Sequence, residues 1–411
     1  MTDRLYYHDS FLYEFDAEVM ESAARNAADS RPALVLDRTA FYPTSGGQVF
    51  DTGYIVPASD APIKLRVVEV GDADDGRILH YLEGESQLKP GDHVHGIIDI
   101  DRRRDHVQQH SGQHVLSAAF VSLFNLPTVS FHMGAEACSI DLDTNSLSPA
   151  QVEAAESQAN DVISQDRKVS IRYVTQEEAT NLGLRKLPPA ERDRLRLIEI
   201  EDFDLSACGG THVAATGQIG CILLRKTEKV RQGWRVEFVC GKRAVSTARR
   251  DYVALAEAAG LCSSALWEIP QQVRKLQEDS REARKSREHQ LEEIASLHGA
   301  ALTASTPKTG ERSVIMRSFP DRDSTFIKLL AQRLVRQEVP VVALLASVLA
   351  PAGLVFAQSP RQPFDMAALM KEALDQLGGR GGGSKDMAQG GPLHVDEIDA
   401  VLAQIAAKLR D

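Results

Sequence analysis

Two short segments of this chain each carry a pair of metal-binding side chains. His110 and His114 are four residues apart in an apolar-periodic run that predicts a helix. Residues at this spacing share one helix face, so both imidazoles can reach one ion. Cys208 and His212 bracket Gly209-Gly210-Thr211, which predicts a tight turn that brings thiolate and imidazole to one point. Three imidazoles and one thiolate form a tetrahedral ligand set for zinc, so we predict one zinc ion joining the two segments.

Two interpretations of this zinc remain open at the level of sequence. Four protein ligands are typical of a closed structural site, which here would clip the helix to a distant turn. A functional site would require one ligand to yield to water or substrate, or the ion to act electrostatically beside the reaction. Gln113 and Thr211 lie next to the ligands. These two side chains either hold water or substrate, or cap and pack.

The pattern of elements predicts an α+β protein of several domains within 411 residues. Short strand-like runs separated by Gly, Pro and Asp clusters predict a small β-barrel over residues 1–98. Residues 99–241 predict an α+β domain that carries the zinc. Within it, Ser148 is expected to cap a helix with Pro149 as its first residue. Strands over residues 168–174, 195–200, 219–225 and 234–239 are expected to form one sheet, with a polar bend between residue 200 and the Cys208 turn. A charged helical arm is expected over residues 242–302, followed by a polar linker. The C-terminal α/β domain is expected over residues 312–411, where Asp365 can cap a helix over residues 366–377.

Charge and hydropathy limit the classes of partner. The formal net charge of −11 argues against a protein that coats nucleic acid non-specifically. It leaves room for a local basic cluster, and Arg102-Arg103-Arg104 just before the zinc helix is either such a phosphate contact or a solvated face. No apolar run is long enough to span a membrane, and the N-terminus lacks the order of a signal peptide. We therefore expect a cytoplasmic protein without a membrane partner.

Two glycine-containing segments allow more than one interpretation. Gly46 and Gly47 lie in Tyr42-Pro43-Thr44-Ser45-Gly46-Gly47-Gln48, which predicts either a β-turn or a backbone cradle for a ribose or phosphate. Near the C-terminus, Arg380 and Lys385 flank the run Gly381-Gly382-Gly383-Ser384. This run is either a flexible loop or a phosphate site built from backbone N–H groups.

Taken together, these motifs resemble a known family. His-x-x-x-His followed by Cys-Gly-Gly-Thr-His resembles the editing domain of alanyl-tRNA synthetase and its relatives in threonyl-tRNA synthetase. Residues 36–48 with Asp51-Thr52-Gly53 are similar to the small barrel before that domain, and residues 379–391 are similar to the glycine-rich signature of a DHH-associated domain. The chain lacks room for an aminoacylation core. It therefore resembles the long form of the free-standing alanyl-tRNA editing proteins of the AlaX type.

The resemblance implies an aminoacyl-tRNA deacylase, a carboxylic ester hydrolase acting in trans for translation fidelity. Its substrate would be mischarged tRNA(Ala), chiefly seryl-tRNA(Ala), with glycyl-tRNA(Ala) as a second substrate. His110, His114, Cys208 and His212 would be the zinc ligands. Thr39 and Gln113 fall at or near positions that family members use around the amino acid, although Thr39 alone also fits an ordinary strand residue. Phe131 stands where some editing sites have a glutamine.

Three functions are weighed against one another. The first is the editing hydrolase. The second is a tRNA-binding, translation-associated protein with a purely structural zinc. The third, a zinc phosphoesterase, is disfavoured because the chain has no Asp-His-His cluster for paired metals. The resemblance also leads us to expect a homodimer through the helical arm and the C-terminal domain.

Overall fold

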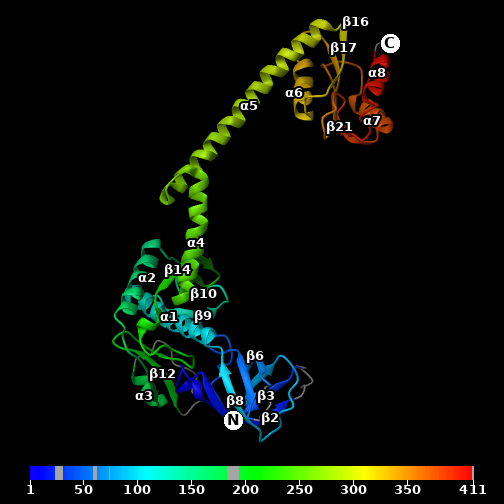
Figure 1. The fold of residues 1–411 in the computed structure, drawn as a ribbon. Helices are drawn as coiled ribbons and strands as arrows, with labels where there is room; N and C mark the ends of the chain where they lie inside the picture. Colours follow the sequence, from blue (N-terminus) through cyan, green and yellow to red (C-terminus); the bar gives the residue numbers. More distant parts are fainter. Residues whose placement is uncertain (24–30, 59–62, 74, 183–193, 410–411) are drawn as a thin grey trace. The chain divides into compact units, whose positions relative to one another are not determined.

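The computed structural model describes residues 1–23, 31–58, 63–73, 75–182 and 194–409. The chain folds into two compact units, Met1–Glu257 and Ala258–Asp411, which are described separately (Figure 1). No helix in the described part of the chain is long and apolar enough to cross a membrane.

The first unit begins with a closed antiparallel barrel, as the sequence predicts. Its strand order is β2-β3-β7-β6-β5-β8. Along β7, the alternate residues Ile78, His80 and Leu82 are buried inside the barrel, which is the period of two expected of a half-buried strand. The strands are β2 (Glu14–Ala23), β3 (Ala33–Leu36), β5 (Gly53–Pro57), β6 (Leu65–Asp72), β7 (Ile78–Leu82) and β8 (His93–Ile98), and a parallel pair of β1 (Asp3–Arg4) and β4 (Arg38–Thr39) lies outside this order.

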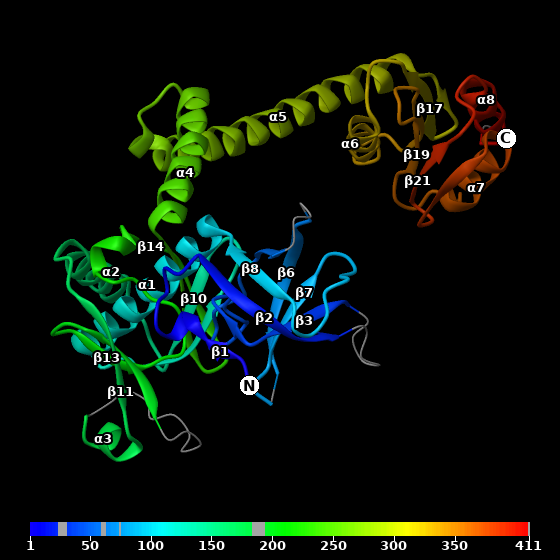
Figure 2. The ribbon, with the colours of Figure 1, turned by 60° about the horizontal axis from the view of Figure 1, so that its bottom comes forward.

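The predicted zinc helix follows the barrel as α1 (Ile100–Phe124). It packs on a four-stranded antiparallel sheet of order β14-β15-β10-β9, which Figure 2 shows beside the barrel. A Cβ on Gly112 would lie 2.2 Å from the Cys240 sulfur, so glycine is required for this close approach. The predicted helix with Ser148 as N-cap and Pro149 at its first turn is α2 (Pro149–Ser164). The strands are β9 (Thr128–Met133), β10 (Cys138–Leu142), β14 (Ile222–Val230) and β15 (Gly233–Cys240).

The remaining strands of the first unit correct one prediction. The sequence predicted that all strands after residue 168 complete a single sheet, but they divide between two. Residues Asp204–Ala207, expected to be a polar bend, form β13 and pair with β12 (Leu195–Ile200). Because β11 (Val169–Val174) takes the other edge of β12, a separate three-stranded sheet results. The short helices α3 (Gln176–Asn181) and η2 (Thr216–Ile219) complete this part.

One buried ion pair joins the barrel to α1. The Arg103 guanidinium is fully buried, with Nε and Nη2 3.0 and 2.5 Å from Oδ2 of Asp51. It also donates to the carbonyl oxygens of Ser10 and Ala40, at 2.8 and 2.5 Å. The prediction that Arg103 contacts tRNA is therefore wrong, because every part of this side chain is enclosed and bonded within the fold.

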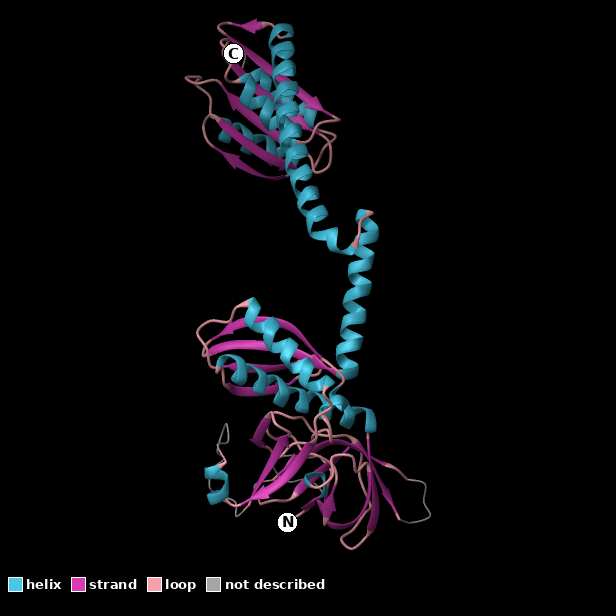
Figure 3. Cartoon of the chain, turned by 90° about the vertical axis from the view of Figure 1, so that its left-hand side faces the viewer, coloured by secondary structure: helices cyan, strands magenta, loops and turns pink. Residues whose placement is uncertain are grey.

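The second unit is a mixed sheet covered on both faces (Figure 3). Its order is β16-β17-β18-β19-β21-β20, and only β17 and β18 run parallel among the strand pairs described for this sheet. Helices α5 and α6 pack on one face and α7 and α8 on the other, so β18 is buried along its whole length. The strands are β16 (Lys308–Thr309), β17 (Arg312–Phe319), β18 (Val341–Ser347), β19 (Gly353–Gln358), β20 (Gly379–Gly383) and β21 (Met387–Pro392).

The arm is helical, and the helix predicted over residues 366–377 is found with the same bounds. The arm consists of α4 (Gly241–Cys262), η3 (Leu266–Glu268) and α5 (Ile269–Ser305). Part of the predicted linker is instead β16, paired with β17. Asp365 caps α7 as predicted, accepting from the N–H groups of Ala367 and Ala368. The helices of the C-terminal unit are α6 (Ser324–Leu334), α7 (Met366–Leu377) and α8 (Ile398–Lys408).

The glycine run near the C-terminus is part of a β-hairpin, so it is not a flexible loop. It forms β20, which pairs with β21 at the edge of the sheet. A Cβ on Gly381 would lie 2.6 Å from the Leu374 side chain of α7. Glycine therefore serves close packing of this hairpin against the helix.

We expect Arg103→Met to lower the free energy of unfolding by about 3–5 kcal/mol, because it leaves the Asp51 carboxylate buried without its cation. The matched control is Arg104→Met on the neighbouring exposed residue, which should change the stability by less than about 1 kcal/mol. Urea unfolding of both variants measures the difference. Equal losses of stability in the two variants would show that the buried pair does not hold the barrel to α1.

Candidate functional site

The four residues predicted as metal ligands converge in the first unit. His110 and His114 project from one face of α1, whereas Cys208 and His212 lie in the turn after β13. One ligand atom from each residue lies within 4.8 Å of all the others. The Cys208 sulfur is 3.3 Å from Nε2 of His110, and the three imidazole centroids are 4.7 to 5.3 Å apart. This arrangement could hold one metal ion.

Unsatisfied nitrogen atoms support a metal in this cluster. Nε2 of His114 and both ring nitrogens of His212 are buried and have no hydrogen-bond partner in the described part of the chain. Leaving a buried polar atom unpaired costs about 1–3 kcal/mol. Coordination of a metal would satisfy one nitrogen of each ring, and the donor set of imidazole and thiolate suits zinc.

The Gln48 side chain connects the two halves of the cluster. Its amide oxygen accepts from Nδ1 of His110 at 2.7 Å and from the backbone N–H of Thr211 at 3.1 Å. Its amide nitrogen donates to the Thr211 hydroxyl at 2.9 Å. With a proton on Nδ1, His110 presents Nε2 to the centre of the cluster. Such outer contacts orient ligands and raise metal affinity.

The Cys-Gly-Gly-Thr-His turn is held by backbone contacts. Arg196 donates from Nη1 to the carbonyl oxygens of Cys208 and Gly210, at 2.7 and 3.1 Å. A Cβ on Gly210 would lie 2.1 Å from the His110 ring, so this position must be glycine. The Ser111 hydroxyl accepts from the N–H of Val213 at 3.0 Å, which ties the turn to α1.

Neither Gln48 nor Arg196 is among the residues predicted from the sequence to act at this site. Gln48 lies within a motif that the sequence singled out, but nothing in that motif shows that its side chain points toward a helix residue 62 positions later. Arg196 could have been recognised from the sequence, because it is a charged residue within the apolar run that forms the strand Leu195–Ile200. The structure shows that its position is buried. A charged residue in such a strand predicts a specific partner.

Electrostatics favour a thiolate in the cluster. Burial opposes charge on Cys208, but His110 and His212 hold the pKa of its thiol well below the usual value. Burial also opposes charge on His114, yet Asp204 at 3.5 Å and Cys208 raise the pKa of that imidazole to about 9. Burial lowers the pKa of His212 to about 3. The deprotonated sulfur is the form that binds a metal.

A pocket of about 410 Å³ opens beside the cluster. It runs from the Cys208 turn along the exposed face of α1, and the Phe131 ring forms one wall, 5.5 Å from the His110 ring centroid. Of its described lining side chains, none is Asp, Glu, Lys or Arg. They belong to Gly46, His110, Gln113, His114, Val121, Asn125, Pro127, Thr128, Val129, Ser130, Phe131, Ser206, Ala207 and Cys208.

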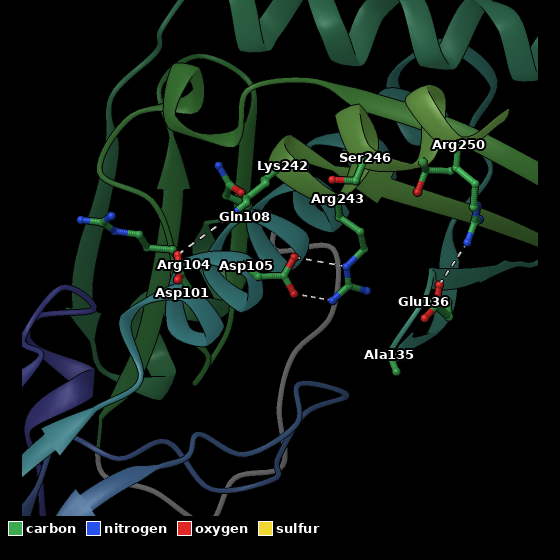
Figure 4. Close-up of a pocket in the computed structure, with 11 residues that line it drawn as sticks. Asp101, Arg104, Asp105, Gln108, Ala135, Glu136, Lys242, Arg243, Ser246 and Arg250 are labelled. Carbon is green, nitrogen blue, oxygen red and sulfur yellow. Dashed lines mark hydrogen bonds and ion pairs between the residues drawn. The ribbon is translucent and has the colours of Figure 1, made fainter. Parts of the chain in front are cut away.

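A larger hollow of about 740 Å³ lies on the opposite face of α1 (Figure 4). It contains the exposed Arg104, and its other charged groups are paired within the fold. Arg243 bonds both oxygens of Asp105, and Arg250 lies 3.5 Å from Glu136. Among the described residues, the only His/Cys/carboxylate group that could hold a metal ion lies beside the smaller pocket, which is therefore the candidate reaction site.

The structure places the other predicted substrate residues in three different environments. Gln113 lines the pocket and donates to the Ser117 hydroxyl at 2.8 Å. Thr211 is buried behind the cluster and holds Gln48. Thr39 lies inside the barrel, with its hydroxyl 2.8 Å from Nε2 of His80 and 3.1 Å from the N–H of Phe41. The structure therefore does not bring Thr39 into the pocket, because its hydroxyl is enclosed in the barrel core.

The predicted tRNA-binding residues are also separated. Gly46 borders the pocket with φ +57°, and Gly47 packs on β9, where a Cβ would lie 2.5 Å from the Phe131 carbonyl oxygen. Arg102 is half-buried and donates to the carbonyl oxygen of Phe50 at 2.9 Å. Arg380 and Lys385 are exposed in the second unit. The glycine segment thus forms a turn that positions Gln48, rather than an isolated phosphate cradle.

Comparison with known proteins shows the family of this chain. A family model described as tRNA synthetases class II (A) matches residues 2–102, and one described as threonyl and alanyl tRNA synthetase second additional domain matches residues 195–236. An alanyl-tRNA editing protein AlaX-L from Pyrococcus horikoshii is 33% identical, over 95% of this chain and 94% of that protein. The chain belongs to the AlaX-L alanyl-tRNA editing proteins.

Members of a second group are similar to this AlaX-L chain over part of their length. An alanine–tRNA ligase of Pyrococcus furiosus is 30% identical over 99% of this chain, which spans only 44% of that enzyme. A ligase of Pyrococcus abyssi is 31% identical with the same coverage. The solved C-Ala domain of Aquifex aeolicus alanyl-tRNA synthetase covers 26% of this chain at 22% identity, with a TM-score of 0.24 that supports no conclusion.

Gln48→Leu should weaken metal binding about 10- to 100-fold, because it removes the acceptor for Nδ1 of His110 and frees the turn at Thr211. Competitive titration with a chelator measures the affinity. The control is Gln108→Leu on the opposite face of α1, whose amide donates to the carbonyl of Gln218 and should leave metal affinity unchanged. If both variants bind metal as the wild type does, the contact with Gln48 does not orient His110.

His80 should make stability depend on pH. Burial lowers its pKa to about 4, while an unfolded histidine titrates near 6.5. Between these values the unfolded chain binds more protons, so the free energy of unfolding should fall with decreasing pH by up to about 1.4 kcal/mol per unit. Urea unfolding from pH 7 to pH 4 should show a shallower dependence for His80→Gln. The control is His93→Gln on an exposed histidine of the barrel, which should keep the wild-type dependence of stability on pH. If the two variants show the same dependence, His80 is not the group that causes it.

Proposed function

We propose that this chain is a trans-editing hydrolase that deacylates mischarged tRNA(Ala). The observation that carries the proposal is a pocket directly beside a convergent His/His/Cys/His cluster, in a chain that matches an AlaX-L editing protein along nearly its whole length. The scissile bond would be the ester between the aminoacyl group and the terminal ribose. We propose seryl-tRNA(Ala) as the main substrate and glycyl-tRNA(Ala) as a second one, in the cytoplasm.

The chain's own residues can supply positioning. An activated ester needs little covalent assistance, so water held beside the carbonyl in the correct orientation is sufficient for a large acceleration. Among the described lining residues, no carboxylate or lysine is available as a general base. Phe131 closes one side of the pocket, which excludes bulk water from the region next to His110.

We propose zinc as the bound ion, with His110, His114, Cys208 and His212 as ligands. When bound, a zinc ion beside the pocket supplies positive charge that stabilises the developing oxyanion of the ester. Gln48 holds the His110 ring for this purpose, and Arg196 holds the backbone of the Cys208 turn. The alternative is a zinc that only closes the fold.

Discrimination of serine from alanine requires a polar partner for the serine hydroxyl. A site with such a partner can reject the substrate that leaves it unpaired. The hydroxyls of Thr39 and Thr211 are already engaged with His80 and Gln48. Gln113 is the predicted substrate residue that lines the pocket, and its amide nitrogen donates to Ser117, so we propose its amide oxygen as the acceptor for the serine hydroxyl.

Binding of the tRNA body is a separate part of the proposal. Arg104, Arg380 and Lys385 are exposed and available for phosphate contacts, whereas Arg103 is not. A DHH-associated identity of the second unit is proposed from its glycine-rich signature. The homodimer stays a prediction, and the exposed Val245 and Tyr252 of α4 are apolar residues that such an interface would bury.

The direct test is deacylation of seryl-, glycyl- and alanyl-tRNA(Ala) by the full chain. Wild type should release serine fastest and leave alanyl-tRNA(Ala) intact. His110→Ala and Cys208→Ala should each lower the rate about 100-fold or more while the circular dichroism spectrum persists. Cys262→Ala, at the end of α4, is the matched control and should retain full activity.

Two results would decide against this proposal. A zinc-loaded wild type that binds tRNA(Ala) without deacylating it would indicate a tRNA-binding, translation-associated protein with a structural zinc. Full activity of His110→Ala would show that the cluster takes no part in the reaction.

A further inference from the structure

The pocket beside the metal cluster is longer than an aminoacyl group requires. Its lining begins at His110 and His114 and continues along the same face of α1 to Val121 and Asn125. His114 and Val121 are two helical turns apart, which is about 10 Å along the axis. A volume of about 410 Å³ is within the range that encloses a ligand of several ring systems, well beyond a serine side chain.

The end of the pocket away from the cluster has the chemistry of a base-binding site. Asn125 ends α1 in the left-handed conformation with φ 55°, and its backbone N–H donates to the carbonyls of Phe120 and Val121. None of the hydrogen bonds among described residues uses its side-chain amide. An asparagine amide offers one donor and one acceptor, the pair that matches the N6 and N7 edge of adenine.

Apolar surface lies next to this amide. Val129 is 52% exposed although it lies in β9, and Pro127 precedes the strand and is exposed as well. The Pro127 carbonyl accepts from the N–H of Asp143 at 2.9 Å, so this segment is fixed to the neighbouring strand. An exposed, rigid apolar surface beside an amide can cover the face of an unstacked base.

Further polar groups line the same pocket. Gln113 donates to the Ser117 hydroxyl at 2.8 Å, and that hydroxyl lies 2.7 Å from the hydroxyl of Thr128. Gln113 and Thr128 line the pocket together with the metal cluster and Asn125. The pocket therefore combines a metal cluster, hydroxyl and amide groups, and an amide with apolar neighbours at the C-terminal end of α1. These groups match an aminoacyl ester, a ribose and a base.

We propose that Asn125, Pro127 and Val129 form a subsite for the adenine of the terminal nucleotide, which the Asn125 amide recognises by its edge. This inference rests on the proposed deacylase function, because it requires the ester carbonyl to lie at the metal cluster. It assigns base selectivity to a residue remote from the bond that is broken.

The test uses small esters that contain only the proposed contacts. Wild type is assayed on serine esterified to the ribose of adenosine, on the same ester of cytidine, and on seryl-tRNA(Ala). The adenosine ester should have a kcat/KM about tenfold higher than the cytidine ester, which is the order of one bidentate base contact. Asn125→Gly should abolish this preference while tolerating φ 55° without strain. Asn181→Gly, an exposed asparagine in α3 outside the pocket, should retain it.

The outcomes separate the subsite from the proposed function. Equal rates on the two small esters, or an unchanged preference in Asn125→Gly, would overturn the adenine subsite while leaving the deacylase intact if seryl-tRNA(Ala) is hydrolysed. Failure of the wild type on all three substrates would overturn the proposed function and the subsite with it.

Discussion

The arrangement of the site depends on one amide group, that of Gln48. This residue comes from the glycine turn between β4 and the barrel strand β5, yet its oxygen accepts from His110 on α1 and from the backbone of the Cys208 turn. Three segments distant in sequence are thereby held at one point. The buried Arg103–Asp51 pair joins the segment just after this turn to α1, about two helical turns before His110. The barrel therefore supports the helix that carries the metal cluster. Precise placement of this kind is what a small polar site requires.

This dependence explains why the barrel and the metal-binding region occur in one compact unit. The matched family regions, residues 2–102 and 195–236, each contain part of the site. The first contributes Gln48 and Asp51, and the second contributes Cys208, His212 and Arg196. Helix α1 brings the remaining two ligands between them. Neither region alone could form the pocket, because the wall, the cluster and the supporting amide come from different elements.

The convergence of His110, His114, Cys208 and His212 was predictable from sequence because the chemistry of each pair is local. Four-residue spacing on a helix and a glycine turn between Cys208 and His212 each constrain two side chains without tertiary information. The helices with Ser148 and Asp365 as caps were predictable for the same reason. Arg103 and Thr39 were not, because neighbouring residues do not show which face of a helix or strand meets the barrel core. The glycine run failed similarly: only the approach of Leu374 shows why Gly381 in β20 has no side chain. The pocket's length toward Asn125 is a property of packing between α1 and β9, and no motif encodes it.

The four side chains are proposed to bind one metal ion at the wall of the substrate pocket. The most direct test of this metal site is the absorption spectrum of the cobalt-substituted protein, with and without a non-hydrolysable seryl-amide analogue of the terminal adenosine. Tetrahedral cobalt with one thiolate ligand should give a sulfur-to-metal charge-transfer band together with visible bands, and the analogue should shift the visible bands. A spectrum without the thiolate band, or one that the bound analogue leaves unchanged, would contradict the claim.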